Sequence, residues 1–136
     1  MIEYPVFYSD KKNKIINKHL FSDVAEFWAE NVHKEAVDER GREKNLNKRS
    51  QIRKFYDEVV RYNEIVKRNK DEWSTIHPFV NMIIAKVVYA EGRKLVSSKF
   101  VDLIKNCVKQ VEDPEDLDVF TNFFEAFMGF YRKYGS

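Results

Sequence analysis

Residues that form turns are scarce in this sequence, which has four glycines and three prolines among 136 residues. A sheet protein needs frequent turns, so this composition favours a few long helices. Apolar residues make up 43% of the chain and include eleven phenylalanines, whose large side chains can hold a small core together. The sequence therefore predicts an all-α fold, with a single compact bundle of about five helices in one domain.

Cysteine is also nearly absent. The only one, Cys107, excludes an internal disulfide and fits a reducing cytosol. It lies within an apolar stripe, which indicates a buried core residue and not a nucleophile. No apolar run approaches the roughly 20 residues that cross a bilayer, and the first residues lack the basic start and apolar segment of a signal peptide. We therefore expect a cytoplasmic protein that has no membrane partner.

The residue patterns that carry most enzyme chemistry are missing as well. The histidines His19, His33 and His77 are far apart, none has a metal-ligand spacing with cysteine, and there is no HExxH motif. Four glycines at scattered positions cannot build a phosphate-binding loop, and no nucleophile context is recognisable. A nuclease assembled from scattered acids is a remote alternative. The sequence predicts a binding protein with no catalytic residue, no cofactor and no metal.

Charge is unevenly distributed, although the net charge is only +2. Seven basic residues and one acid, Glu43, occur between Arg40 and Lys54. Six acids and no basic residue occur between Glu112 and Glu125. This separation predicts a polyanionic partner, a head-to-tail assembly of copies, or both. The alternative is that both segments are solvated charges of loops and helix ends.

Helical periodicity begins after the first part of the chain. Residues 1–17 are aperiodic, so we expect a poorly ordered N-terminal segment there and a helical domain at 18–136. Residues 37–49 are expected to form a mobile loop. The pattern predicts helices that begin near Ser22 and at the cap Ser50, a third at 77–95 with Pro78 in its first turn, a fourth capped by Ser97 or Ser98, and a fifth opened by Asp113 and Pro114.

The 77–95 segment has apolar residues on nearly every side of its helical wheel. We therefore expect it to be buried all round, at the centre of the bundle. Lys86 interrupts it, and such a lysine is paired, extended to the surface, or placed to meet an anion. The second helix raises a similar question, because Arg53, Arg61 and Arg68 can bind an anion or pair with acids three and four residues away.

The last predicted helix carries a heavy aromatic face that includes Phe127 and Tyr131. Phe130 and Tyr134 lie partly off this face, which is more apolar surface than a small core needs, so part of it can meet another chain. Ordinary core packing is the alternative. Exchange of this helix between two copies, across the short hinge at Asp113 and Pro114, is a further route to a dimer. We expect self-association, as a dimer or as stacked copies.

Three segments of the chain together resemble a known family. They are SQIRKFYDEVVRYNE at 50–64, HPFVNMIIAKVVYAEGRKL at 77–95 and DVFTNFFEAFMGFYRKY at 118–134. In this order and at this spacing they are similar to the small subunit of the type III-A CRISPR–Cas effector, the Csm complex. Residues 1–35 add nothing to the likeness.

The resemblance implies a helical, non-catalytic protein that stacks along the effector beside other subunits, with the CRISPR RNA (crRNA) and the target RNA as partners. Such a protein contacts the RNA backbone through basic side chains, because base pairing already supplies the sequence specificity. The RNA-binding residues implied by the motifs are Arg53, Lys54, Lys86, Arg93 and Lys94, with Lys48 and Arg49 just before the first motif as further candidates. The alternative is a purely structural protein–protein adaptor that does not touch RNA.

Overall fold

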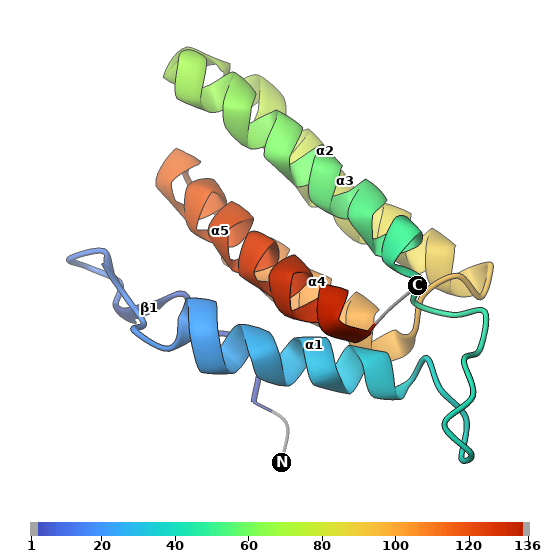
Figure 1. The fold of residues 1–136 in the computed structure, drawn as a ribbon. Helices are drawn as coiled ribbons and strands as arrows, with labels where there is room; N and C mark the ends of the chain where they lie inside the picture. The colour runs from blue at the N-terminus through green and yellow to red at the C-terminus, as the bar shows by residue number, and fades with distance from the viewer. Residues whose placement is uncertain (1–2, 135–136) are drawn as a thin grey trace.

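Five α-helices account for most of the chain in the computed structural model, which describes residues 3–134 (Figure 1). They are α1 (Ala25–Lys34), α2 (Arg49–Arg68), α3 (Trp73–Gly92), α4 (Ser98–Lys109) and α5 (Pro114–Tyr131). The short elements are the strands β1 (Tyr8–Asp10) and β2 (Ile15–Ile16), a π-helical turn η1 (Leu20–Val24), and the 3-10 turns η2 (Lys70–Glu72) and η3 (Arg132–Tyr134). The predicted all-α bundle of about five helices is confirmed.

The centre of this bundle is α5. It packs against both α1 and α2, while α3 packs against α2 and α4. Figure 1 shows α5 between α1 and the α2–α3 pair. The aromatic face of α5 is buried, and Phe127 and Tyr131 are part of it. This face is therefore core, as the packing alternative required, and its aromatic residues are not free to meet another chain.

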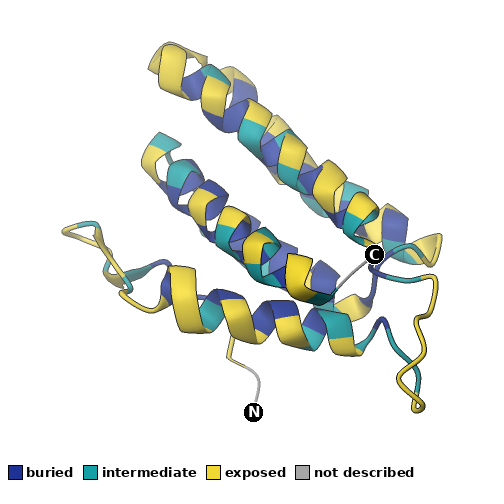
Figure 2. Cartoon of the chain, viewed as in Figure 1, coloured by how far each residue is buried: buried dark blue, intermediate teal, exposed yellow. Residues whose placement is uncertain are grey.

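The third helix, α3, lies at the side of the bundle, so the prediction of a central 77–95 helix was wrong. One strip is buried, spaced at three and four residues: Ile76, Val80, Ile83, Val87 and Ala90. Four other large apolar residues are exposed, namely Phe79, Met82, Val88 and Tyr89, while Trp73 and Ile84 are partly buried. Figure 2 shows the general pattern, in which buried residues line the sides where helices meet. Although α3 has apolar residues on nearly every side, it is not buried on every side, because neighbouring elements cover only part of it.

The starts of α4 and α5 follow local sequence signals, whereas those of α1, α2 and α3 differ from the prediction. Ser22 lies inside the turn η1 and caps no helix, and α1 begins only at Ala25. At the start of α4 the Ser97 hydroxyl accepts from the Phe100 amide at 3.4 Å, and at the start of α5 the Asp113 side chain accepts from the Asp116 amide at 2.9 Å. The predicted cap at Ser50 was wrong, since α2 begins at Arg49 and its N-cap residue makes no side-chain capping bond. Similarly, Pro78 lies inside α3 and not in its first turn, because the helix already begins four residues before His77.

The N-terminal segment differs from the expectation of a poorly ordered 1–17. Strands β1 and β2 pair as an antiparallel hairpin. Phe7 is buried, its ring stacks on Phe120 of α5 with centroids 6.4 Å apart, and its amide donates to the Gln110 side chain at 3.0 Å. Each contact joins one residue to a partner far away in the chain, so local periodicity carried no sign of it. Residues 1–2 of the predicted 1–17 segment and residues 135–136 of the predicted 18–136 domain lie outside the described residues.

Candidate nucleic-acid interface

Two segments that carry predicted RNA-binding residues meet the end of a third helix at one end of the bundle. α2 begins there, and α3 and α5 end there (Figure 1). Asn47 joins the start of α2 to the segment that follows α3, because its backbone amide donates to the Leu95 carbonyl at 3.0 Å and its side chain accepts from the Ser97 amide at 2.8 Å. We call this end the basic pole and define it by Lys48, Arg49, Arg53, Lys54, Arg93, Lys94 and Arg132. It contains every predicted RNA-binding residue except Lys86.

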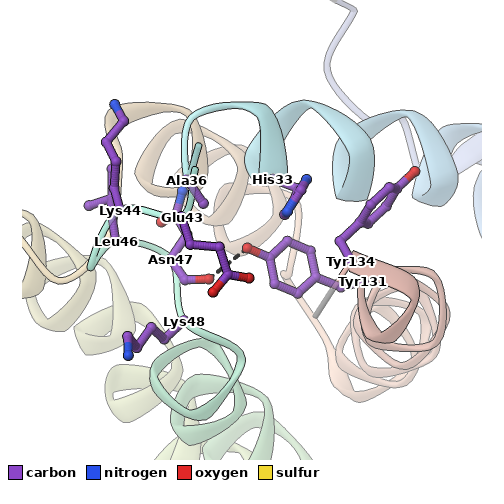
Figure 3. A pocket seen from close by; sticks show the side chains of 9 residues that line it. All are labelled: His33, Ala36, Glu43, Lys44, Leu46, Asn47, Lys48, Tyr131 and Tyr134. Atoms are coloured by element: carbon purple, nitrogen blue, oxygen red, sulfur yellow. Dashed lines mark hydrogen bonds between the residues drawn. The ribbon is translucent and has the colours of Figure 1, made fainter. Parts of the chain in front are cut away.

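The loop between α1 and α2 holds the start of α2 against the end of α5. The Tyr131 hydroxyl donates to the Asn47 carbonyl at 2.6 Å, and His33 of α1 stacks on Tyr134 with ring centroids 4.7 Å apart (Figure 3). Burial raises the pKa of Tyr131, and the Glu43 carboxylate adds to this, so the hydroxyl remains a donor. The loop that was expected to be mobile is therefore a folded connection.

The hollow in Figure 3 is too small for a ligand. Its volume is about 10 Å³, close to the space that a single water molecule needs. The side chains around it come from α1, the α1–α2 loop and the end of α5, so it marks a joint between these elements.

The end of α3 presents Arg93 and Lys94 through a helix-ending turn. The Lys94 and Leu95 amides donate to carbonyls about one turn back, at 2.9 and 3.0 Å, in the bond pattern of a Schellman motif. Lys94 has a φ of 61°, the left-handed conformation that usually belongs to glycine. The Arg93 guanidinium lies over the Tyr89 ring, 5.9 Å from its centroid. Both cations are exposed at this turn.

A groove lies between the start of α2 and the end of α5. Its volume is about 460 Å³, and it is lined by Arg49, Ser50, Arg53, Tyr56, Glu125, Met128, Gly129 and Arg132. We call it the arginine groove, because three arginines border it and a single carboxylate, that of Glu125, lies among them. Sequence reasoning identified Arg49 and Arg53 but missed Arg132, since no sequence pattern links the end of α5 to the start of α2.

Most cations of the basic pole have no carboxylate partner. Among residues 3–134, Arg49, Lys54, Lys94 and Arg132 form no ion pair within 4 Å. Arg53 is an exception, since its Nε lies 3.7 Å from Oδ1 of Asp57 one turn along α2, with both side chains exposed. Such exposed pairs contribute little, so Arg53 can exchange this carboxylate for another anion with little loss.

Lys86 lies apart from the basic pole and is paired. Its Nζ donates to Oε2 of Glu58 at 2.7 Å, and the same oxygen accepts from the Tyr62 hydroxyl at 2.7 Å. The Glu58 side chain is only 14% exposed, so this pair joins α2 to α3 at a site that is partly shielded from solvent. Among the alternatives for a lysine within this helix, the structure favours the paired one.

The acidic segment begins at the opposite end of α5. We call this end the acidic pole and define it by Glu112, Asp113, Glu115, Asp116 and Asp118. Three lysines from elsewhere in the chain neutralise most of it: Lys14 lies 2.8 Å from Asp113 and 2.7 Å from Asp116, Lys11 lies 3.1 Å from Glu112, and Lys67 lies 2.9 Å from Asp118. Within the described part of the chain, Glu115 alone of these acids has no ion pair.

Asp116 is the most buried carboxylate of the acidic pole, with its side chain 1% exposed. It accepts hydrogen bonds from the Tyr8 hydroxyl at 2.6 Å, the Lys14 ammonium at 2.7 Å and the Glu112 amide at 2.9 Å. Burial opposes its ionisation, but these donors outweigh burial and hold the pKa of Asp116 below its usual value. The acidic pole is thus satisfied internally, which weakens the expectation that it attracts the basic pole of another copy.

Other kinds of site find little support in the part of the chain that the structure describes. No group of three or more histidine, cysteine, aspartate or glutamate side chains in residues 3–134 could hold a metal ion. No helix in this range has the length and apolarity to cross a bilayer. Cys107 is buried in α4, and burial raises the pKa of its thiol, which disfavours the nucleophilic thiolate.

The comparisons with known proteins identify a family. No curated protein and no solved structure matches the chain. Residues 26–136 match the family model described as Csm2 Type III-A. This range includes the three motif segments and both poles. Because the match covers most of the sequence, the chain belongs to the Csm2 Type III-A family, the small subunit of the type III-A CRISPR effector complex.

Proposed function

We propose that this chain acts as a non-catalytic subunit of a cytoplasmic, RNA-guided antiviral effector, stacks along that complex, and contacts the crRNA and target RNA backbone without sequence specificity. Family membership supports the role of a subunit. The observation that carries the RNA contact is the basic pole, where cations from three helices gather and most have no carboxylate partner among residues 3–134. Phosphates suit such a surface, because guide–target pairing already reads the sequence.

The candidate residues divide into two groups under this proposal. Lys48, Arg49, Arg53 and Lys54 at the start of α2, with Arg93 and Lys94 at the end of α3, make phosphate contacts. Lys86 instead holds α2 to α3 through Glu58. The pairing of Lys86 supports this division. If Lys86 moved away to bind RNA, the shielded Glu58 carboxylate would be left without its partner, which is unfavourable.

The test measures binding of the purified full chain to fluorescently labelled RNAs of unrelated sequence, single-stranded and duplex, over a series of KCl concentrations. We expect weak binding, similar affinities among sequences, and a log affinity that falls with log salt by about 0.7 to 0.9 for each phosphate contacted. A strong preference for one sequence, or an affinity that is indifferent to salt, would contradict the proposal.

A matched pair of variants checks the division of residues. Replacing Arg93 and Lys94 by glutamine should weaken RNA binding and leave the melting temperature nearly unchanged, because both side chains are exposed. Replacing Lys86 by methionine should lower the melting temperature and leave the RNA affinity nearly unchanged. The reverse pattern would return Lys86 to the RNA-binding set. If none of these cations affects RNA binding while the variants still fail to join the effector, the chain is a structural adaptor.

We also propose that the outward face of α3 meets a neighbouring subunit, either another copy or a different protein of the effector. Its exposed apolar residues Phe79, Met82, Val88 and Tyr89 support this, because large apolar side chains that are exposed on one helix are available to pack against a neighbouring subunit. Replacing Met82 and Tyr89 by lysine should leave the fold intact. Light scattering on the chain alone and co-purification with the other effector proteins then separate self-association from contact with a different subunit.

A further inference from the structure

We propose that the arginine groove is a seat for a phosphate of the RNA backbone, in which Arg132 acts together with Arg49 and Arg53. In this seat Glu125 weakens anion binding, and Gly129 keeps the groove open. The inference rests on the proposed function, since it takes contact with RNA as given and assigns the place on the chain where that contact is made.

Arg132 completes the groove because the bundle joins two distant parts of the chain. It follows directly on Tyr131, whose hydroxyl bonds the Asn47 carbonyl two residues before Arg49. This short hydrogen bond sets the end of α5 beside the start of α2. Neither Arg49 nor Arg132 has an ion pair within the described residues, so neither must leave a carboxylate to bind a phosphate. The planar guanidinium fork also suits bidentate contact with phosphate oxygens.

Glu125 is an exposed carboxylate on the α5 wall of the groove. It forms no ion pair within 4 Å among residues 3–134, so the structure gives it no bridge to maintain. The half-buried Tyr56 lies on the opposite wall of the groove. Burial raises the pKa of the Tyr56 hydroxyl, and the negative charge of Glu125 raises it further. A phosphate in the groove meets the same repulsion. Removing the charge of Glu125 should therefore strengthen binding.

Gly129 lies on the α5 wall of the groove and is exposed. A Cβ atom built at this position meets nothing within 4 Å, so packing does not require glycine there. Glycine within a helix is also less favourable than alanine. The consequence of the missing side chain is free space in the groove. A bulky residue at this position would fill that space without removing any cation.

An RNA phosphate fits the groove better than a carboxylate from the acidic pole of a second copy. Three arginines that line a single groove favour an anion that has several oxygens and a permanent charge. The carboxylates of the acidic pole are mostly engaged by Lys11, Lys14 and Lys67 of their own chain. A carboxylate that is already paired gains little by moving to another cation.

The experiment compares three groove variants of the full chain, Arg132→Gln, Glu125→Gln and Gly129→Leu, with two controls. Arg68→Gln removes the same charge from the far end of α2, about 22 Å from Arg53 along the helix axis. Gly129→Ala changes the same position without filling the groove. Binding to a labelled single-stranded RNA is measured by anisotropy over a KCl series, and thermal unfolding is recorded for each protein.

We expect Arg132→Gln to weaken binding several-fold and to reduce the slope of log affinity against log salt by about 0.7, the value for one lost phosphate contact on a single strand. Glu125→Gln should tighten binding several-fold, and Gly129→Leu should weaken it while Gly129→Ala does not. Arg68→Gln should have a much smaller effect than Arg132→Gln. The Glu125→Gln result is decisive where a variant loses stability, because partial unfolding does not produce tighter binding.

The outcomes separate the groove from the proposed function. If the unmodified chain binds RNA with the expected salt dependence but the three groove variants match it, the groove is not the seat and the proposed function stands. If the unmodified chain does not bind RNA at all, both fail. If the groove variants bind RNA normally but no longer co-purify with other effector proteins, the groove takes a protein partner and the phosphate seat is overturned.

Discussion

The two poles of the molecule carry opposite charges, and they differ most in how those charges are satisfied. At the acidic pole the carboxylates of Asp113 and Asp116 share Lys14, and further lysines take Glu112 and Asp118. At the basic pole most cations have no such partner among the described residues. A charge run in a sequence therefore does not reveal whether the charge stabilises the fold or is available to a ligand. Only its partners reveal that.

The acidic pole is neutralised because another segment of the chain supplies its ion-pair partners. Lys11 and Lys14 belong to the hairpin of β1 and β2, which folds back onto the start of α5. Among residues 3–134, no comparable acidic segment folds onto the basic pole. It is held together by bonds of backbone and neutral groups, such as those of Tyr131 and Asn47. Removing charge should therefore destabilise the acidic pole and leave the basic pole folded.

The largest effect is expected from Asp116→Ala. This change leaves the Lys14 ammonium and the Tyr8 hydroxyl without their shared acceptor, and it should lower the free energy of unfolding by about 3 kcal/mol. The exposed, unpaired Glu115 is the matched control, since Glu115→Ala should change stability by less than about 0.5 kcal/mol. Urea denaturation of the two variants gives both values. Equal losses in the two would remove the distinction between paired and unpaired acids.

Acid should weaken the acidic pole by the same mechanism. Burial opposes the ionisation of Asp116 and Asp118, yet the donors around each hold its pKa below the usual value. A carboxyl whose pKa is lower in the folded chain stabilises the fold above its unfolded pKa of about 3.9. That contribution is lost as the pH falls from about 4 through the lower folded pKa. Melting temperatures between pH 7 and pH 3 should show this fall, and Asp116→Asn should make it shallower.

Tyr131→Phe tests the neutral joint of the basic pole. The change removes the hydrogen bond to the Asn47 carbonyl and leaves that buried acceptor without this donor, so stability should fall by about 1 to 1.5 kcal/mol. The aromatic ring and its packing are kept. Thermal unfolding measures the loss. A change that is independent of salt would agree with a neutral bond, whereas strong salt dependence would indicate that charge holds this pole together.

The smallest effects are expected from the cations of the basic pole. Lys54→Gln should change the free energy of unfolding by less than about 0.5 kcal/mol, because no ion pair of Lys54 within residues 3–134 is lost. Lys94→Gly should increase it by about 0.5 to 1 kcal/mol, since glycine adopts the left-handed conformation of this position without strain. Calorimetry of both variants checks the signs. A clear loss of stability in either would show that these cations support the fold.

Local patterns predicted the elements of the fold better than their arrangement. The apolar stripes of α2, α4 and α5, the Ser97 cap and the Asp113–Pro114 start were all readable, because each depends on residues within a few positions of one another. The apolar residues on nearly every side of α3 led to the wrong prediction of a fully buried helix, because burial depends on which neighbouring elements cover it. The hairpin at the N-terminus left no periodic signal, although Phe7 enters the core through it.

The candidate site shows the same division. Motif resemblance led to Arg53 and Lys54, and proximity to the motif led to Lys48 and Arg49. Nothing in the sequence placed Arg132 beside them or paired Lys86 with Glu58. The chain by itself determined its helices, its family and the types of charge it carries, because these follow from composition and short-range spacing. Tertiary packing alone decided which charges are neutralised and which are left at the surface, because ion pairs and grooves form between residues that only folding brings together.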